Sequence, residues 1–353
     1  MMSTRVLTLR GSPRRRGGIA AVVGLSLVAL AACSGAGGDD DGGPAQIRIA
    51  LPTGVTSFAN ADVVVADELG YFEDAGIEVE IMNLRSGTSV ANGVVGGEFE
   101  VGGASIEPVV NAFAGGAEIS VFASYADRLE VELVVPEDVQ SVEDLAGRDL
   151  GIQEVGAFRE AMTRMVLEDA GMTPNDVNYV SVSSDAYVSG LVQGQIASAV
   201  LHPEQGFQAA AEDPSLHPLV NLYEIEPDYF YGAYFADNAW LEDNPDAARG
   251  FAQALTRAHR TMYAERDRVV PIIAEVTSME ESVIDDAWEV YMQDVQAFPR
   301  NVGLEENRLE YTLERMQQME TLAPGAEVDL AELIDRGPME AAVEELGEAE
   351  QRE

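Results

Sequence analysis

The stretch GVVGGEFEVGGASIEP, residues 93–108, carries the pattern from which the fold can be predicted. It reads as a helix end, a glycine turn, a short strand and the corner where the strand passes into the next helix. A second stretch, GLVQGQIASAVLHPEQ at residues 190–205, aligns with it without gaps. The shared positions are Gly93 with Gly190, Val95 with Val192, Gly97 with Gly194, and Glu107 with Glu204. Two similar halves are therefore expected, and both duplication and ordinary strand-to-helix punctuation could produce them.

Outward from these stretches, short apolar runs alternate with helical periodicity, which predicts an α/β fold on mainly parallel sheets. In the first half we expect strands over 47–53, 77–84, 99–105 and 117–126, with helices over 59–72, 88–98 and 107–116. In the second half we expect strands over 177–182 and 197–201, with helices over 157–170, 185–193 and 203–211. Residues 129–139 and 228–237 read as extended, and 244–264, 266–276, 279–294 and 304–322 as helices with no later strand.

The amino terminus predicts export. Residues 1–16 hold five arginines and no acid, and residues 19–32 form an apolar run too short for a permanent membrane span. The run ends in Leu30-Ala31-Ala32-Cys33, which resembles a bacterial lipobox, and Cys33 is the chain's one cysteine. We expect a signal peptide over 1–32, a lipid on Cys33 and a flexible acidic tether over 33–45. The folded part would then be anchored at the outer face of the cell membrane, although an ordinary secretory signal remains an alternative.

The charge of the chain restricts its partners. The formal net charge is −41, it becomes −46 once the five arginines of residues 1–32 are removed, and the chain contains no lysine. Such a charge argues against nucleic acid and against anionic lipid, because phosphate contacts need a basic surface. Salt adaptation or a generally acidic proteome would explain it. With its one cysteine assigned to a lipid, the chain has no thiolate metal site. We also expect no other metal and no cofactor, and a monomer is the default expectation.

Several segments together resemble the substrate-binding proteins of ATP-binding-cassette importers, in the group that includes sulfonate, taurine, nitrate and thiamine-pyrimidine binding proteins. The segments are GYF (70–72), GIEVE (76–80), GGEFEVGGAS (96–105), SVEDLAGRDLGI (141–152), GQIASAVLHPEQ (194–205), FADNAWLEDNPDAARGFAQALTRAH (235–259) and VDLAELIDRGPMEAAVEELG (328–347). The resemblance extends over nearly all of the chain beyond the tether. Glu100 and Ala197 stand where this group often has an aspartate, so the specificity of a particular member is not carried over.

The resemblance implies a two-lobed periplasmic-binding-protein fold of type II. The lobes would be residues 46–128 and 140–228, joined by a crossing at 129–139 and a return crossing at 229–237. Residues 238–353 would form helices that pack on the first lobe, followed by a tail. Such lobes close on a small-molecule ligand, and the closed form delivers it to a membrane permease and its ATPase. An enzyme is not expected.

Ligand-binding residues are expected at the corners where strands end and helices begin, because ligands of open α/β sheets bind there. The candidates are Thr53, Ser57, Phe58, Ser86, Thr88, Ser105, Glu107, Phe158, Arg159, Asp185, His202, Glu204 and Tyr231. Each has a plainer alternative: the hydroxyls could cap helices, the aromatic rings could belong to the core, and His202 could have no task. Arg159 and Arg85 could bind an anionic ligand or pair with one of the many acids.

Enzymatic motifs are missing from the sequence. It has no G-x-S-x-G elbow, no phosphate-binding loop and no H-E-x-x-H, and its three histidines are far apart. Two other functions stay open, namely an enzyme similar to the fungal pyrimidine-precursor synthases and a ligand sensor that docks to a signalling receptor. The ligand itself is open as well, since hydroxyl and amide donors suit a sulfonate, carboxylate or nitrate, and aromatic rings suit a pyrimidine or another flat ring.

Overall fold

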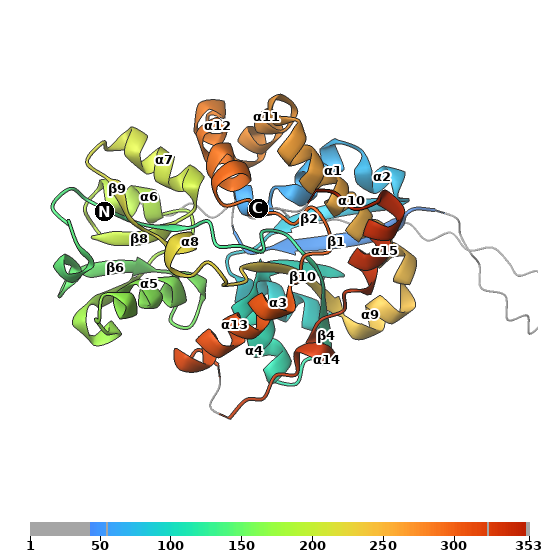
Figure 1. Cartoon of the computed structure of the whole chain (residues 1–353), viewed down its shortest axis with the longest axis horizontal. Helices are drawn as coiled ribbons and strands as arrows, with labels where there is room; N and C mark the ends of the chain where they lie inside the picture. Colours follow the sequence, from blue (N-terminus) through green and yellow to red (C-terminus); the bar gives the residue numbers. More distant parts are fainter. Residues whose placement is uncertain (1–42, 54–55, 323–324, 351–353) are drawn as a thin grey trace, which may run out of the picture. The chain divides into compact units, whose positions relative to one another are not determined.

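The computed structural model describes residues 43–53, 56–322 and 325–350 (Figure 1). The predicted signal peptide (1–32), the lipidation site Cys33 and the tether as far as residue 42 lie outside the described residues. In the described part, helices flank two five-stranded sheets, so the predicted α/β class is confirmed. None of the described helices combines the length and the apolar character that crossing a bilayer requires.

The first sheet has the strand order β2-β1-β3-β10-β4. Its strands are β1 (Ala45–Leu51), β2 (Ile77–Asn83), β3 (Val101–Ser105), β4 (Ile119–Ser124) and β10 (Gly232–Asp237). β1 is parallel to β2 and β3, whereas β10 is antiparallel to β3 and β4. A Cβ atom at Gly102 or Gly103 of β3 would lie 2.7 Å from the ring of Phe235 or Tyr234. These two glycines therefore allow large aromatic side chains of β10 to pack on the middle of the sheet.

The second sheet has the order β7-β6-β8-β5-β9. Its strands are β5 (Glu132–Val135), β6 (Asp149–Ile152), β7 (Asn178–Ser181), β8 (Ser198–Leu201) and β9 (His217–Asn221). β6 is parallel to β7 and β8, and β5 is antiparallel to β8 and β9. β9 has no predicted counterpart, because it contains a proline and is only partly buried, so apolar alternation does not mark it.

Both sheets are mixed: four strands of each run in the same direction, in agreement with the predicted mainly parallel sheets, and the fourth strand in the order runs the opposite way. The chain enters the fourth strand of each sheet directly from the other sheet. β5 is the next strand after β4, and β10 is the next strand after β9. Because no crossover helix joins these strands to their neighbours, they can enter the sheet antiparallel. The sheets match strand for strand, and Gly97 and Gly194, which precede β3 and β8, have φ angles of +71° and +64°. The repeated stretches therefore occupy equivalent places, in turns that favour glycine.

The predicted crossings overlap with strands. Residues 129–139 include β5 of the second sheet, and residues 229–237 include β10 of the first. The chain leaves the first sheet after Ser124 and joins the second at Glu132; it then runs from Ile225, the end of a short helix, to Gly232. A division into lobes at the predicted boundaries stays a prediction.

Helices cover both sheets. Around the first half they are η1 (Phe58–Asn60), α1 (Asp62–Glu68), α2 (Tyr71–Asp74), α3 (Gly87–Val95) and α4 (Ile106–Ala114). Around the second half they are η2 (Val142–Leu145), α5 (Phe158–Asp169), η3 (Pro174–Asp176), α6 (Tyr187–Val192), α7 (Pro203–Glu212) and α8 (Leu222–Ile225). Figure 1 shows α5 on one face of the second sheet and α6 and α7 on the other. Along the chain, α4, α5 and α7 begin shortly after the ends of β3, β6 and β8.

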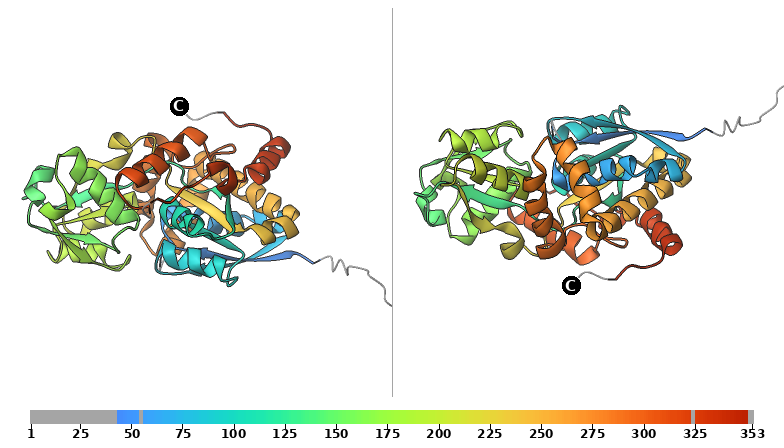
Figure 2. Two further views of the ribbon diagram at one scale, coloured as in Figure 1. Left: turned by 90° about the horizontal axis from the view of Figure 1, so that it is seen from below. Right: turned by 90° about the horizontal axis from the view of Figure 1, so that it is seen from above.

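The carboxyl-terminal part is helical, as predicted. Its elements are α9 (Asn238–Asp243), α10 (Pro245–Ala264), α11 (Arg266–Thr277), α12 (Glu281–Glu289), η4 (Val290–Asp294), α13 (Glu306–Gln318), α14 (Leu330–Leu333) and α15 (Gly337–Leu346). The predicted helix over 279–294 is divided, because η4 is a π-helix. α10 packs against α1, α2 and α15, so orange and red helices lie beside blue elements in Figure 2, whereas α12 also packs on α7. After β10, the described residues add only a bridge between Val121 and Ile334.

Candidate functional site

Two neighbouring cavities lie where the corners of both sheets come together. Their volumes are about 300 Å³ and about 230 Å³. Thr53, Arg159, Ser184 and His202 line both cavities, so the two spaces adjoin along these side chains. Most of the lining comes from residues that follow β1, β3, β6 and β8, which is where open sheets bind ligands.

Eleven of the thirteen predicted ligand-binding residues line these cavities. The larger one is lined by Thr53, Ser86, Thr88, Ser105, Phe158, Arg159, His202 and Tyr231, and the smaller by Thr53, Ser57, Arg159, Asp185, His202 and Glu204. Their convergence follows from the symmetry of the fold, since equivalent corners of the two sheets face one another. Contact of these side chains with a ligand stays a prediction.

The other two candidates, Phe58 and Glu107, line neither cavity among the described residues. Phe58 is fully buried in η1 and stacks on Tyr291, with ring centroids 4.1 Å apart. Glu107 lies in the first turn of α4, where Oε1 accepts a hydrogen bond of 2.7 Å from the hydroxyl of Tyr229. Burial raises the pKa of Glu107. Both residues do follow corners, as predicted, but their side chains point into the packed interior.

The capping alternative holds for one of the serines. The hydroxyl of Ser86 accepts a hydrogen bond of 3.2 Å from the backbone N–H of Ser89 and caps α3. Ser57 and Ser105 are also the residues before helices, but their side chains make no capping bond. Hydroxyls that line a cavity without capping a helix are better placed to face a solute.

Arg159 is the cation of the site. Its side chain, at the start of α5, is almost fully buried and lines both cavities. The guanidinium donates to the carbonyl of Val200 and to Oε1 of Gln205 at 3.0 Å, and it lies 4.3 Å from the ring centroid of Tyr187. Among the described residues, no carboxylate forms an ion pair with it, so the pairing with an acid that would have explained Arg159 is not seen. A buried cation with this surrounding favours an anion in the cavity.

Arg85, the second cation at a predicted corner, lines neither cavity. Its carbonyl oxygen accepts a hydrogen bond from the side chain of Gln153. Its charge contributes to the lowered pKa of Asp185, although the hydrogen bond from Ser183 is the larger cause. Arg85 therefore offers a natural comparison for Arg159, since it has the same charge at a corner outside the cavities.

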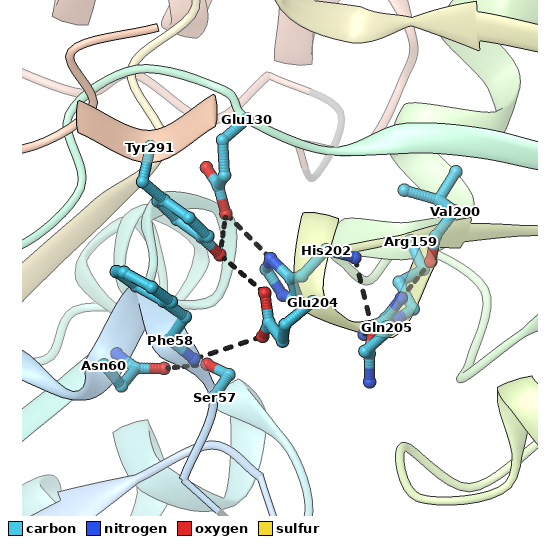
Figure 3. Close-up of polar contacts among 10 residues, drawn as sticks. All are labelled: Ser57, Phe58, Asn60, Glu130, Arg159, Val200, His202, Glu204, Gln205 and Tyr291. Atoms are coloured by element: carbon cyan, nitrogen blue, oxygen red, sulfur yellow. Dashed lines mark hydrogen bonds and ion pairs between the residues drawn. The ribbon is translucent and has the colours of Figure 1, made fainter. Parts of the chain in front are cut away.

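His202 belongs to a buried polar network (Figure 3). Its Nδ1 lies 2.7 Å from Oε1 of Glu130, a residue just before β5. Burial lowers the pKa of His202 to about 4 and raises that of Glu130 to about 8. At neutral pH both side chains are therefore uncharged, as expected of a pair removed from water.

The network continues to the first half of the chain through Glu204 and Tyr291. The hydroxyl of Tyr291 lies 3.2 Å from Oε2 of Glu204 and 3.4 Å from Oε1 of Glu130. The other oxygen of Glu204 accepts a hydrogen bond of 3.1 Å from the backbone N–H of Phe58. Burial raises the pKa of Glu204, which sits in the first turn of α7 as Glu107 does in α4. Side chains from three separate segments and a backbone N–H from a fourth thus meet beside the cavities.

Comparison with known proteins places this architecture in a family. A family model described as NMT1/THI5 like matches residues 57–268, which is more than half of the chain. The chain belongs to the NMT1/THI5-like family. This confirms the resemblance found in the sequence, whereas no curated protein matches the chain.

Solved structures share the fold of this NMT1/THI5-like chain at low sequence identity. The alkanesulfonate-binding protein of Xanthomonas axonopodis pv. citri, bound to MOPS, is 17% identical, with a TM-score of 0.65 over 85% of this chain and 98% of that one. The periplasmic nitrate-binding protein of Synechocystis PCC 6803 is 13% identical, with a TM-score of 0.72 over 86% and 89%. The periplasmic aliphatic sulphonate-binding protein of Escherichia coli is 15% identical, with a TM-score of 0.64 over 82% and 91%. The fold is therefore that of the periplasmic binding proteins.

Sequence reasoning did not find every residue of the site. The lining residues that it missed are Pro52, Gly87, Ala91, Asn92, Pro108, Asn111, Ala112, Gln153, Glu154, Gly156, Ala157 and Ser184 in the larger cavity, and Thr56, Val188, Ser189, Gln205, Gln208, Glu212, Thr277 and Met279 in the smaller. Many lie in or next to the same strand-to-helix corners as the candidates, so the corners were predicted although these residues were not named. Glu130 and Tyr291 carried no signal, because one precedes a strand and the other lies in a distant π-helix.

Direct hydrogen bonds join segments on two sides of the larger cavity in this NMT1/THI5-like chain. The hydroxyl of Thr88, in α3, donates to Oε1 of Glu154, after β6, at 3.2 Å. The side chain of Gln153 donates to the carbonyl of Arg85 beside it. The corners of the two sheets are thus in contact beside the larger cavity. Among the described residues, no group of histidine, cysteine, aspartate and glutamate side chains is placed to hold a metal ion.

Proposed function

We propose that this chain is an extracytoplasmic solute-binding protein that encloses a small organic solute in the two cavities and delivers it to an ATP-driven importer. The observation that carries the proposal is the buried guanidinium of Arg159, which lines both cavities and forms no ion pair with a described carboxylate. A site built in this way binds an anion without covalent chemistry. The family membership and the anion-binding names of the similar structures support it.

The larger cavity suggests the rest of the solute. Ala91, Pro108 and Phe158 provide apolar surface, and Asn92 and Asn111 provide amide groups. A solute with an anionic group at Arg159 and a small apolar or flat body would use both. Sulfonates and carboxylates with short organic substituents are the class that we propose, and a pyrimidine-type solute would use the ring of Phe158 or Tyr231 instead.

Binding by Arg159 can be tested with the purified chain and a panel of sulfonates, carboxylates, nitrate and pyrimidines. A solute at a hundred times its dissociation constant should stabilise the fold by about 2.7 kcal/mol in a thermal-shift assay. Arg159→Gln should lower the affinity for that solute by about tenfold to a hundredfold, as measured by calorimetry, because hydrogen bonds to a charged group are lost. Arg85→Gln, which removes the same charge outside the cavities, should leave the affinity within about twofold.

Two outcomes would count against this proposal. Equal weakening by Arg159→Gln and Arg85→Gln would show a general effect of charge and not a site. No stabilisation by any solute of the panel, with a folded protein by circular dichroism, would remove the proposed ligand class.

Anchoring by a lipid on Cys33 is the second part of the proposal, supported by the lipobox-like sequence before it. Cells that express the full chain should incorporate labelled palmitate into it, and the protein should sediment with membranes. Cys33→Ser should abolish both the label and the sedimentation, because serine offers no thiol for the lipid. Sedimentation of the serine variant with membranes would contradict a lipid anchor.

A catalytic role is the second candidate, and the pair of His202 and Glu130 beside the cavities is the observation that favours it. A histidine next to a carboxyl group can act as a general base. The two functions are separated by incubating the protein with a bound solute and recovering the solute for mass spectrometry. An unchanged solute after prolonged incubation supports binding alone, and a changed mass supports catalysis.

A further inference from the structure

The histidine of the site has one ring nitrogen engaged, and its side chain lies beside both cavities. Nδ1 of His202 lies 2.7 Å from Oε1 of Glu130, whereas Nε2 has no hydrogen-bond partner among the described residues. His202 lines both cavities, as Arg159 does. The hydrogen-bonding character of Nε2 is therefore part of what a solute meets, and it depends on where the pair keeps its shared proton.

We propose that Glu130 is a positioning residue that holds His202 as a neutral ring with its proton on Nε2, so that the cavity presents a second donor beside Arg159. This inference rests on the proposed function and refines its solute class. The solute should carry acceptor atoms toward both Arg159 and His202, as an oxyanion with two or more oxygens does. A solute that presents an ammonium or amide N–H group to His202 would be rejected, because two donors would face each other.

The geometry favours a protonated Glu130 over the alternatives. Glu130 is fully buried, and its Oε2 has no hydrogen-bond partner in the described part of the chain. A carboxylate would leave a charged oxygen unsatisfied there, whereas a carboxylic acid can donate from Oε1 to Nδ1 and leave only a carbonyl oxygen. Tyr291 can donate to Glu204 at 3.2 Å, the shorter of its two contacts, so Oε1 of Glu130 is available as the donor.

The charges around the pair agree with a neutral ring. Arg159 opposes a second positive charge on His202, and Glu204 favours one, but burial outweighs both and keeps the pKa of His202 near 4. Tyr125, Tyr231 and Tyr291 also face Glu130, and burial raises the pKa of each hydroxyl well above its ordinary value, so all three stay neutral. Above pH 8 Glu130 ionises, the ring proton moves to Nδ1 to meet the carboxylate, and Nε2 becomes an acceptor.

The tautomer can be measured without a solute. The full chain contains three histidines, His202, His217 and His259, and labelling them with ¹⁵N gives signals that single His→Gln variants assign. At pH 7 we expect His202 to carry its proton on Nε2, and above pH 8 on Nδ1. Glu130→Gln should keep the proton on Nε2 up to pH 9.5, since the amide N–H donates to Nδ1 at any pH. A ring protonated on Nδ1 alone, or on both nitrogens, at pH 7 would overturn the proposal.

The consequence for binding is tested with the oxyanion that the panel identifies. Its affinity for the wild-type chain should fall by about tenfold or more as the pH rises from 7 to 9.5, because a donor is replaced by an acceptor. Glu130→Ala should bind weakly at pH 7, and Glu130→Gln should restore binding and remove the alkaline loss. A matched control is Glu132→Gln, two residues along, whose pKa burial raises to about 7 but which does not touch His202; this variant should keep the alkaline loss.

The failure of this inference is separable from that of the proposed function. An alkaline loss that persists in Glu130→Gln, or that disappears in Glu132→Gln, would sink the assignment of Glu130 although a solute still binds. Conversely, the expected tautomer with no solute bound would leave the positioning role of Glu130 standing and remove the solute-binding function.

Discussion

Asp62 illustrates, at the residue scale, how a buried polar group holds distant elements together. Its Oδ2 lies 2.8 Å from Nε2 of His259, and its Oδ1 accepts a hydrogen bond of 2.6 Å from Tyr234. The other ring nitrogen of His259 lies 3.0 Å from the carbonyl oxygen of Pro299, so it must carry a proton. One further proton is shared between the ring and Asp62. The three side chains, all fully buried, tie α1, α10 and β10 to one another.

Removing Asp62 should therefore cost more than removing one of its donors. We expect Asp62→Ala to lower the free energy of unfolding by about 3–5 kcal/mol, because His259 and Tyr234 both lose their partner inside the core. Tyr234→Phe should cost about 1–3 kcal/mol, and Tyr71→Phe, which removes a single hydrogen bond to Thr261, about 1 kcal/mol. Urea unfolding at pH 7 measures the order. A smaller loss for Asp62→Ala than for Tyr234→Phe would contradict this account.

The residues of the site were predictable to the extent that they follow corners. Thr53, Ser105 and His202 could be named because each ends a strand, and strand ends are visible in the sequence. Whether a side chain then turned toward a cavity, as Arg159 does, or into the interior, as Phe58 does, was not visible. That choice depends on the partner it finds in space, which for Phe58 is the ring of Tyr291.

At the scale of elements, strand β10 follows the second sheet in the chain but is held tightly in the first sheet. It is paired on both sides, with β3 and β4, and begins at Gly232. A Cβ atom at Gly232 would lie 2.0 Å from ring carbons of Tyr125. Tyr125 is itself fully buried and packs edge-on against Tyr231 and Tyr234. The distances between ring centroids are 5.5 Å and 5.4 Å. Neither the strand nor the ring has space to move away.

Gly232→Ala should therefore destabilise the fold by about 1–3 kcal/mol, through overpacking of a confined site. Gly190→Ala is the comparison: a Cβ atom in α6 would meet only the flexible tip of Ile196 at 3.3 Å, and alanine favours a helix. We expect that variant to lie within about 1 kcal/mol of the wild type. Thermal and urea unfolding measure the stability of both variants. Equal stabilities would show that β10 and Tyr125 can shift to make room for the added Cβ atom.

Elements with strong periodicity were predicted within a few residues, and elements defined by their neighbours were not. α10 and α5 have long amphipathic patterns, so their bounds follow from the sequence. The π-helix η4 does not, because one widened turn leaves no mark on a pattern of apolar residues. The antiparallel entry of β5 and β10 was missed for a similar reason: direction in a sheet depends on which strand lies alongside.

For the whole molecule, buried acids make stability depend on pH. Burial raises the pKa of Glu130 to about 8 and of Glu132 to about 7, from an ordinary value of 4.5. Between pH 4.5 and these values the folded state keeps protons that the unfolded chain has lost, so the free energy of unfolding falls as the pH rises. His202 has the opposite effect, because its pKa is lowered from 6.5 to about 4, but only between those two values.

Above pH 6.5 the histidine no longer offsets the acids. We expect the free energy of unfolding to fall between pH 6.5 and pH 8, by on the order of 1–2 kcal/mol, and most steeply just above pH 6.5. Glu130→Gln should flatten the part of the decline above pH 7. Urea unfolding at pH 5, 6.5 and 8 in constant salt measures the profile, and a protein more stable at pH 8 than at pH 6.5 would rule out the raised values.

The sequence alone determined the local structure of this protein: the alternation of strands and helices, the glycine turns, and two equivalent corners 97 residues apart. These features depend on residues that are neighbours in the chain, so their pattern is legible in one dimension. Only the tertiary structure decided that β10, which follows the whole second sheet in the chain, pairs with β3 and β4 of the first sheet, and that His202, Glu130 and Tyr291 meet. These contacts join residues 72 and 161 positions apart, and they form only because packing of the whole chain brings their elements to one place.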